Sequence, residues 1–320
     1  MFSAAVLELD AAKAVLEIEE ALRRQVLDTL GRRGCVVGVS GGVDSAVVAT
    51  LCARALGRER VLALLMPERD NSPESLVLGR QVCDHLGVPS VVEDIGPALD
   101  GLGCYRRQDE AIRQVFPEWG PGWRCKLALP SLLEGDRLNV FSLVVADPTG
   151  AQKRARLPHD AYLKLVAATN FKQRVRKMME YYHADRLRYA VAGTPNRLEY
   201  DQGFFVKQGD GAADVKPIAH LYKTQVYALA EALGVPEEIR SRPPTTDTYS
   251  LPQTQEEFYF ALPYGPMDLC LWGLDHGVPP DEVAAGIGLT AAQVERVYQD
   301  LGAKRRAGRY LHSPPLLAGD

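Results

Sequence analysis

The stretch CVVGVSGGVDSAVV, residues 35–48, is an apolar run that six residues, SGGVDS at positions 40–45, interrupt. Residues 35–39 have the composition of a buried β-strand, and the apolar residues after the interruption predict a helix. A strand that leads into a helix through a glycine-rich turn leaves backbone N–H groups unpaired at the helix N-terminus, where the helix dipole also favours negative charge. The stretch therefore predicts an anion-binding turn between a strand and a helix.

The side chains of this turn add to the prediction. Gly41 and Gly42 allow an anion to approach the backbone closely, while Ser40 and Ser45 supply hydroxyl donors. The carboxylate of Asp44 would repel a phosphate unless a metal ion lay between them, so it is a candidate Mg²⁺ ligand. The spacing is neither that of a Walker A loop nor that of a dinucleotide-binding G-x-G-x-x-G turn. The alternative, a serine–glycine turn with a helix-capping aspartate, explains the doubled glycine and the buried strand less well.

The composition is that of a globular protein with a sizeable core. The formal charge of −4 over 320 residues creates no general attraction for nucleic acid, so we expect no nucleic-acid partner. The six cysteines form no C-x-x-C pair and lie near no histidine at metal-ligand spacing, which is typical of reduced, buried thiols in a cytoplasmic protein. The N-terminus lacks a secretion signal, and no apolar run is long enough for a membrane span. We therefore expect a cytoplasmic protein without a membrane partner.

The periodicity along the chain predicts alternating strands and helices. We expect strands at 35–39, 61–66, 90–93 and 189–192 and helices at 10–31, 46–56, 75–86, 162–187 and 223–233. Such alternation is typical of an α/β fold, a Rossmann-like, doubly wound parallel sheet flanked by helices. The length allows one or two domains, and we expect a single domain over residues 1–320.

The alternation fails between about residues 100 and 160, which we interpret as an insertion. Within it, residues 140–146 and 151–157 are expected to pair as a β-hairpin around a turn at 147–150. Five prolines at 243–266 predict an irregular stretch suited to a lid or a substrate loop. A helical C-terminal portion is expected at about 266–312, and it includes a capping-box start at Thr290-x-x-Gln293.

Two stretches of the sequence carry a resemblance to known enzymes. The S-G-G-x-D-S turn resembles the pyrophosphate loop of the N-type ATP pyrophosphatases, which adenylate a substrate and release pyrophosphate. The stretch GTPNRLEYDQGFFVKQGDGAADVKPIAHLYKTQV at 193–226 and PPTTD at 243–247 resemble the NAD⁺ synthetase family, which amidates nicotinic acid adenine dinucleotide. The resemblance covers about residues 34–98 and 165–248. It implies an adenine nucleotide alpha hydrolase-like fold and Mg²⁺ and ATP as cofactor and co-substrate.

The resemblance also implies roles for individual residues. Asp44, Ser45 and Lys223 take the catalytic positions, and Asp44 and Glu199 take those of the Mg²⁺ ligands. ATP is expected to contact Gly38, Val39, Ser40, Gly41, Gly42, Val43, Asp44, Ser45, Thr194, Lys223 and Thr245. The substrate is expected to contact Arg174, Lys207, Asp214 and Lys304.

The chain departs from the family's pattern at four sites near those residues. Val206 replaces the usual threonine of G-[YF]-F-T-K, and Pro195 stands where glycine or aspartate is usual. The segment after Thr245 is rich in aromatic residues, and the histidine that usually precedes the position of Lys304 is missing. These differences concern the substrate more than ATP.

The reaction that the resemblance implies has two steps. A carboxylate attacks the α-phosphorus of ATP to form an acyl-adenylate, and ammonia then displaces AMP. We expect direct use of ammonia, because the glutaminase domain of longer relatives does not fit before residue 35. The family's homodimeric state, with the substrate site at the interface, is implied as well. An amide synthetase for another carboxylate is the first alternative; the second, a non-catalytic nucleotide-binding protein, would not need both Asp44 and Glu199.

Overall fold

The fold was analysed in a computed structural model that describes residues 2–129, 141–246 and 248–318. The described residues form a parallel sheet in the order β3-β2-β1-β7. Its strands are β1 (Cys35–Gly38), β2 (Val61–Leu65), β3 (Ser90–Val92) and β7 (Ala190–Ala192). In register, Cys35 pairs with Val61 on one side and with Ala190 on the other. The predicted parallel α/β sheet is confirmed, with strand ends within two residues of those expected.

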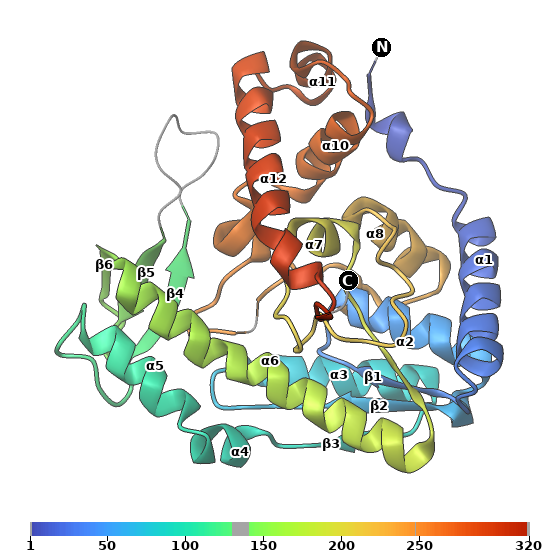
Figure 1. The fold of residues 1–320 in the computed structure, drawn as a ribbon, viewed down its shortest axis with the longest axis horizontal. Coiled ribbons are helices and arrows are strands. Elements are labelled where there is room, and N and C mark those ends of the chain that lie inside the picture. Colours follow the sequence, from blue (N-terminus) through green and yellow to red (C-terminus); the bar gives the residue numbers. More distant parts are fainter. Residues whose placement is uncertain (1, 130–140, 247, 319–320) are drawn as a thin grey trace.

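Helices cover both faces of this sheet, as Figure 1 shows. Alternate strand residues such as Val37 and Ala63 pack on one face with α1 (Ala11–Arg23), α2 (Val43–Leu56), α3 (Pro73–Leu86) and α8 (Lys223–Ala232). Val36 and Val191 point to the opposite face, where they pack against α6 (His159–Leu187). Strands β1, β2 and β7 are buried on both faces, which is why they are almost continuously apolar, whereas the edge strand β3 is partly exposed.

The region expected to be an insertion contains two short helices and a second sheet. The helices are α4 (Gly96–Gly101) and α5 (Cys104–Arg113), and the antiparallel strands are β4 (Arg124–Ala128), β5 (Ser142–Ala146) and β6 (Gln152–Arg156). The predicted hairpin is confirmed as β5 and β6, although residue 140 lies outside the described residues. Asp147 shapes its turn by accepting hydrogen bonds from the backbone of Thr149 at 2.8 Å and Ala151 at 3.1 Å. Leu127 and Leu143 of the small sheet pack with α5 and α6.

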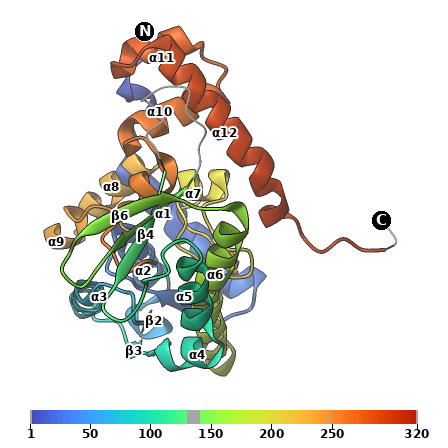
Figure 2. The same ribbon diagram turned by 90° about the vertical axis from the view of Figure 1, so that its left-hand side faces the viewer.

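The C-terminal part of the chain forms a separate helical cluster. It comprises α7 (Arg197–Gln202), α10 (Tyr264–Asp275), α11 (Pro280–Ile287) and α12 (Ala291–His312), with a π-turn at Glu256–Phe260. The short helix α9 (Glu237–Arg240) packs instead with α2 and α8 in the core beside the parallel sheet. Thr290 and Gln293 form the predicted capping box at the start of α12. Figure 2 shows α10, α11 and α12 together at one end of the molecule, with the residues after α12 leading away from it.

Short turns of helix complete the structure, at Ala4–Leu7, Arg24–Thr29 and Arg58–Arg60. All six cysteines are free and buried. Within the described part of the chain, no helix combines the length and apolar character that a membrane crossing needs.

Candidate active site

The turn at residues 40–45 connects β1 to the N-terminus of α2. Gly41 has a φ of +79°, and a Cβ at this position would lie 2.8 Å from Leu78 Cβ and 2.9 Å from the backbone oxygen of Ser75. Only glycine meets both the backbone conformation and the close approach of α3. Gly42 is the N-cap of α2, so the first N–H groups of this helix have no carbonyl partner within the helix.

The serine hydroxyls brace this turn from within. Ser45 Oγ accepts a hydrogen bond from Ser40 N at 3.2 Å and donates to the Gly42 carbonyl at 3.0 Å. Ser40 Oγ accepts from Gly42 N at 3.3 Å. Ser45 is buried, so its side chain ties the two ends of the turn together from the inside.

Two carboxylates and one lysine meet beside the turn. Lys223, at the start of α8, is fully buried and donates to Asp44 Oδ2. Asp44 Oδ1 accepts from the amide of Asn196 at 3.2 Å. Glu199 is buried close by, and its Oε1 accepts from the side chain of Gln255 at 3.0 Å.

Asn196 links the two carboxylates through the start of α7. Its side chain accepts from Glu199 N at 3.1 Å, and Glu199 Oε2 accepts from Asn196 N at 3.2 Å, which is a reciprocal capping box. The same Asn196 amide donates to Asp44, so the cap of one helix orients a carboxylate on another. The pattern N-x-x-E at 196–199 is the sequence signal by which this role could have been found.

The proximity of these groups changes their proton affinities. Burial, followed by the nearby charge of Asp44, raises the pKa of Glu199 from 4.5 to about 8. Burial alone would lower the pKa of Lys223, but the carboxylates of Asp44 and Glu199 outweigh it, so the pKa of this lysine is raised. Lys223 is therefore charged at neutral pH, whereas Glu199, with a pKa of about 8, is largely protonated there.

This arrangement of oxygen ligands fits a hard divalent cation. A cation between Asp44 and Glu199 would offset the burial and the repulsion by Asp44 that together raise the pKa of Glu199. The described residues contain no cluster of three or more histidine, cysteine, aspartate or glutamate side chains that could enclose a metal. A cation held by two carboxylates alone would keep open positions for water and phosphate oxygens, which is the coordination that Mg²⁺ adopts with nucleotides.

A cavity of about 1130 Å³ opens next to these groups. Its volume exceeds the roughly 300–1,000 Å³ of a typical site for one small ligand. The predicted residues on its wall are Gly38, Val39, Ser40, Gly42, Val43, Asp44, Ser45, Thr194, Thr245, Glu199, Arg174 and Lys207. Residues from the turn, from α6, from the loop after β7 and from the proline-rich segment thus meet around one space.

Four predicted residues do not line the cavity. Gly41 and Lys223 lie just behind its wall, in contact with residues that do line it. Lys304 is largely buried within the helical cluster, where it pairs with Asp300 at 2.7 Å and donates to the Tyr259 carbonyl at 2.7 Å. Its proposed contact with substrate stays a prediction.

Asp214, the fourth, is exposed and lies in the segment that pairs with the edge of β7. It accepts hydrogen bonds from Val191 N at 2.8 Å and from the hydroxyl of Tyr181 at 3.2 Å. The two predicted substrate residues on the cavity wall also contact protein groups. Arg174 donates to the Lys207 carbonyl at 3.3 Å, and Lys207 donates to the Tyr310 carbonyl at the end of α12 at 2.7 Å.

Comparison with known proteins identifies the family to which these features belong. The model of the family described as NAD synthase matches residues 14–114 and 139–306. The chain belongs to the NAD synthase family. The resemblance carried by the turn at 40–45 and by residues 193–226 is thereby confirmed.

Relatives within the NAD synthase family match nearly the whole chain. The NH₃-dependent NAD⁺ synthetase of Mesorhizobium japonicum is 65% identical over 313 residues, which are 98% of this chain and 98% of that protein. The enzyme of the same name from Rhizobium meliloti is 61% identical over 317 residues, covering 99% of this chain and 95% of that protein.

Solved structures of the NAD synthase family share the fold. The NH₃-dependent NAD synthetase from Campylobacter jejuni aligns with a TM-score of 0.63 at 23% identity, covering 97% of this chain and 99% of that chain. The expected adenine nucleotide alpha hydrolase-like fold is thereby confirmed.

Proposed function

We propose that this chain is an ammonia-dependent NAD⁺ synthetase, a ligase that converts ATP, nicotinic acid adenine dinucleotide and ammonia into NAD⁺, AMP and pyrophosphate. Relatives that carry this name are 59–65% identical over almost the entire chain. The observation that carries the proposal is the meeting of Asp44, Lys223 and Glu199 beside a glycine-rich turn that presents the N-terminus of α2.

In the first step, the substrate carboxylate attacks the α-phosphorus of ATP. A carbon-bound oxygen becomes bonded to phosphorus while the bond between the α-phosphorus and the pyrophosphate oxygen breaks, which yields an acyl-adenylate. The backbone amides of the turn and the ammonium of Lys223 stabilise the charge that grows on the departing pyrophosphate. Lys223 is fully buried, so its side chain is held in one position, and its raised pKa keeps it charged. The positive charge is therefore in place before the reaction begins.

We propose that Asp44 and Glu199 hold a Mg²⁺ ion when ATP binds. The ion would supply neutralisation of phosphate charge, as divalent ions do in other reactions of nucleotides. The raised pKa of Glu199 leaves its carboxyl group largely protonated at neutral pH without a cation, and a metal ligand must be ionised. Binding of the metal would therefore release a proton from this carboxyl group.

In the second step, ammonia attacks the acyl carbon of the adenylate, AMP leaves with the bridging oxygen, and the new amide loses a proton. No covalent bond to the protein is required, so no nucleophilic side chain needs to be found. Arg174 and Lys207 on the cavity wall are proposed to hold the anionic dinucleotide. Asp214 and Lys304 are proposed as its further contacts, and ATP is proposed to contact Thr194 and Thr245.

A homodimer is proposed as well. Met178 and Tyr182 lie one turn apart on α6, and each is 58% exposed. An apolar pair on a long exposed helix is suited to pack against a second copy of the chain. Since Asp214 contacts Tyr181 of the same helix, such a dimer would bring the exposed substrate residue close to the interface. Tyr182→Glu should lower the sedimentation coefficient of the protein to that of a monomer, and an unchanged value would contradict this interface.

The experiment that tests the activity uses the purified protein with ATP, Mg²⁺, ammonium and nicotinic acid adenine dinucleotide. AMP and NAD⁺ should appear in equal amounts. AMP formed only with other carboxylic acids would show an amide synthetase with a different substrate, and no AMP with any acid would contradict a ligase.

The six buried free thiols fit a reducing compartment, which supports a cytoplasmic location.

A further inference from the structure

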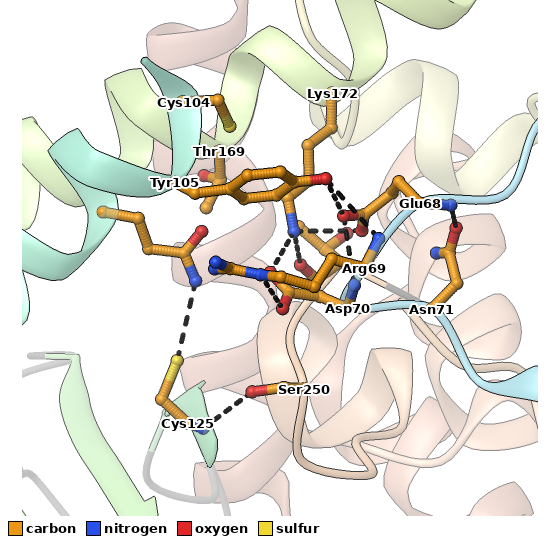
Figure 3. A network of polar contacts seen from close by, with 12 residues as sticks. Glu68, Arg69, Asp70, Asn71, Cys104, Tyr105, Cys125, Thr169, Lys172 and Ser250 are labelled. Carbon is orange, nitrogen blue, oxygen red and sulfur yellow. Dashed lines mark hydrogen bonds and ion pairs between the residues drawn. The ribbon is translucent and has the colours of Figure 1, made fainter. Parts of the chain in front are cut away.

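A buried polar network beside the cavity centres on Lys172 (Figure 3). Lys172 projects from α6 and is fully buried. Its ammonium donates to Asp70 Oδ2 at 2.6 Å and to the Thr248 carbonyl at 2.7 Å, and forms an ion pair with Glu68 at 3.0 Å. We call Lys172, Glu68, Asp70, Tyr105 and the Thr248 carbonyl the Lys172 network.

The acids of this network come from the turn that follows β2. Glu68 Oε2 accepts from the Tyr105 hydroxyl at 3.0 Å and from Asp70 N at 3.1 Å. The guanidinium of Arg69 lies 3.9 Å above the Tyr105 ring. The turn is thus held by α5 and α6 together, and Glu68 also lines the cavity. Since buried ion pairs contribute little net stability compared with apolar packing, their clearest use is to fix geometry.

The Thr248 carbonyl belongs to a segment that is attached to its surroundings at several further points. We call residues 248–255 the anchored segment. On the insertion side, Ser250 Oγ accepts from Cys125 N at 3.0 Å and Leu251 N donates to the Cys125 carbonyl at 2.9 Å, so the segment extends the edge of β4. At its far end, the side chain of Gln255 donates to Glu199. The small sheet of the insertion therefore holds one side of the anchored segment, and the Lys172 network holds the other.

The anchored segment in turn carries Thr245, a predicted ATP contact on the cavity wall. Thr245 pairs with Thr254 in an antiparallel bridge. Gln255 N donates to the Pro244 carbonyl at 3.0 Å, and Thr246 N donates to the Gln253 carbonyl at 3.3 Å. A shift of the anchored segment would therefore move Thr245, and would also move the amide of Gln255 that contacts Glu199.

We propose that Lys172 is a positioning residue for ATP binding, which locks the anchored segment to the turn after β2 and so places Thr245 and Gln255 at the cavity. The KM and kcat part of this inference rests on the proposed function, because it requires a measurable reaction. The part that concerns the position of the anchored segment does not depend on which carboxylate the enzyme activates.

The test compares two double variants. Lys172→Met/Asp70→Asn removes the ammonium and one of its two acids, so the network keeps its net charge of one negative while Thr248 loses its donor. The control, Glu19→Gln/Arg54→Met, removes a neutral ion pair between α1 and α2, joined at 2.6 Å, whose members do not line the cavity. Both variants and the wild type are measured for hydrogen exchange, for equilibrium binding of ATP with Mg²⁺, and for KM and kcat.

The Lys172→Met/Asp70→Asn variant should exchange the amides of the anchored segment about tenfold faster, since one of its attachments is lost. Its dissociation constant and KM for ATP should rise about tenfold while kcat changes by less than about threefold. A loss of folded protein alone would lower kcat at unchanged KM. The control should show unaltered exchange in the anchored segment and an unaltered KM.

The proposal would be overturned if Lys172→Met/Asp70→Asn matched the wild type both in hydrogen exchange of the anchored segment and in its affinity for ATP. Tyr105→Phe serves as a second variant should the first fail to fold, because it removes only the hydroxyl that holds Glu68 and keeps every charge. It should raise the KM for ATP about threefold, and an unchanged KM and exchange rate would overturn the proposal too. If the wild type formed no NAD⁺, the proposed function would be wrong. Hydrogen exchange and equilibrium binding of ATP would then still test the role of Lys172, because neither measurement requires the reaction.

Discussion

Replacing Glu199 with glutamine should make the metal-free protein more stable at neutral pH while it removes activity. Glu199 has a pKa near 8 in the folded protein and an ordinary pKa of 4.5, because burial and Asp44 disfavour its charge. The folded state therefore binds this proton more tightly than the unfolded state. The resulting stability is fully present below about pH 4.5 and is lost as the pH rises toward 8.

The magnitude follows from the difference between the two pKa values. Each pH unit above 4.5 lowers the free energy of unfolding by about 1.4 kcal/mol until the folded carboxyl group ionises, so the loss reaches about 3 kcal/mol, to order of magnitude, at pH 7. Glu199→Gln cannot ionise and avoids this loss. The substitution also alters the hydrogen bond from Gln255, at a cost of about 1 kcal/mol that is independent of pH.

The assay is urea unfolding in the presence of a chelator at several pH values between 5 and 8. The free energy of unfolding of the wild type should fall by about 3 kcal/mol relative to that of Glu199→Gln over this range. Adding Mg²⁺ should recover much of the loss in the wild type and little in the variant, since the cation stabilises the ionised carboxylate. Parallel pH profiles for the two proteins would refute the reasoning about Glu199.

Two further substitutions test the surroundings of the turn. Lys223→Met should reduce the rate of AMP formation about 10²- to 10³-fold, as the loss of one preorganised charge in a buried site does, and less than a tenfold effect would argue against its role toward pyrophosphate. Gly41→Ala should lower the free energy of unfolding by about 1–3 kcal/mol and weaken ATP binding, because the new Cβ would meet Leu78 and Ser75 at under 3 Å. A Gly41→Ala protein with the thermal stability and ATP affinity of the wild type would contradict the strained geometry of the turn.

The fold could be predicted from local patterns because its decisive elements are local. Residues 35–38 are apolar on both faces, so they had to form an inner strand of a parallel sheet. Gly41, with its positive φ, marks a turn whose conformation only glycine adopts easily, and Thr290-x-x-Gln293 marks a helix start. Each of these signals depends on residues within a few positions of one another. The two helices α4 and α5 were not predicted, because prolines and glycines surround their short apolar stripes.

The residues of the candidate site could be predicted where a sequence motif specifies their identity. Contacts between segments that are distant in the sequence were harder to predict. Asp44, Glu199 and Lys223 were expected in one place, and the structure places them together. Asn196 was not assigned a role, although N-x-x-E at 196–199 is a recognisable capping box.

The Lys172 network left no signal in the sequence that local reasoning could use. Lys172 and Asp70 are 102 positions apart, and Cys125 and Ser250 are 125 positions apart. A lysine between helical neighbours is most often a solvated residue, and only the packing of α5 and α6 onto the turn after β2 buries this one. The periodicity of a sequence indicates which face of a helix is apolar. It does not indicate which carboxylate, distant in the sequence, forms an ion pair with a given lysine.

The central claim is that a carboxylate is activated by adenylation at the 40–45 turn. The most direct test traces an oxygen atom of the substrate carboxylate into the products. Nicotinic acid adenine dinucleotide labelled with ¹⁸O in its carboxylate is converted in the presence of ATP, Mg²⁺ and ammonium, and the AMP is examined by mass spectrometry. One ¹⁸O atom should be found in each AMP, because the carboxylate oxygen that attacks the α-phosphorus leaves with AMP. Unlabelled AMP formed alongside NAD⁺, or ¹⁸O in the pyrophosphate, would contradict the account.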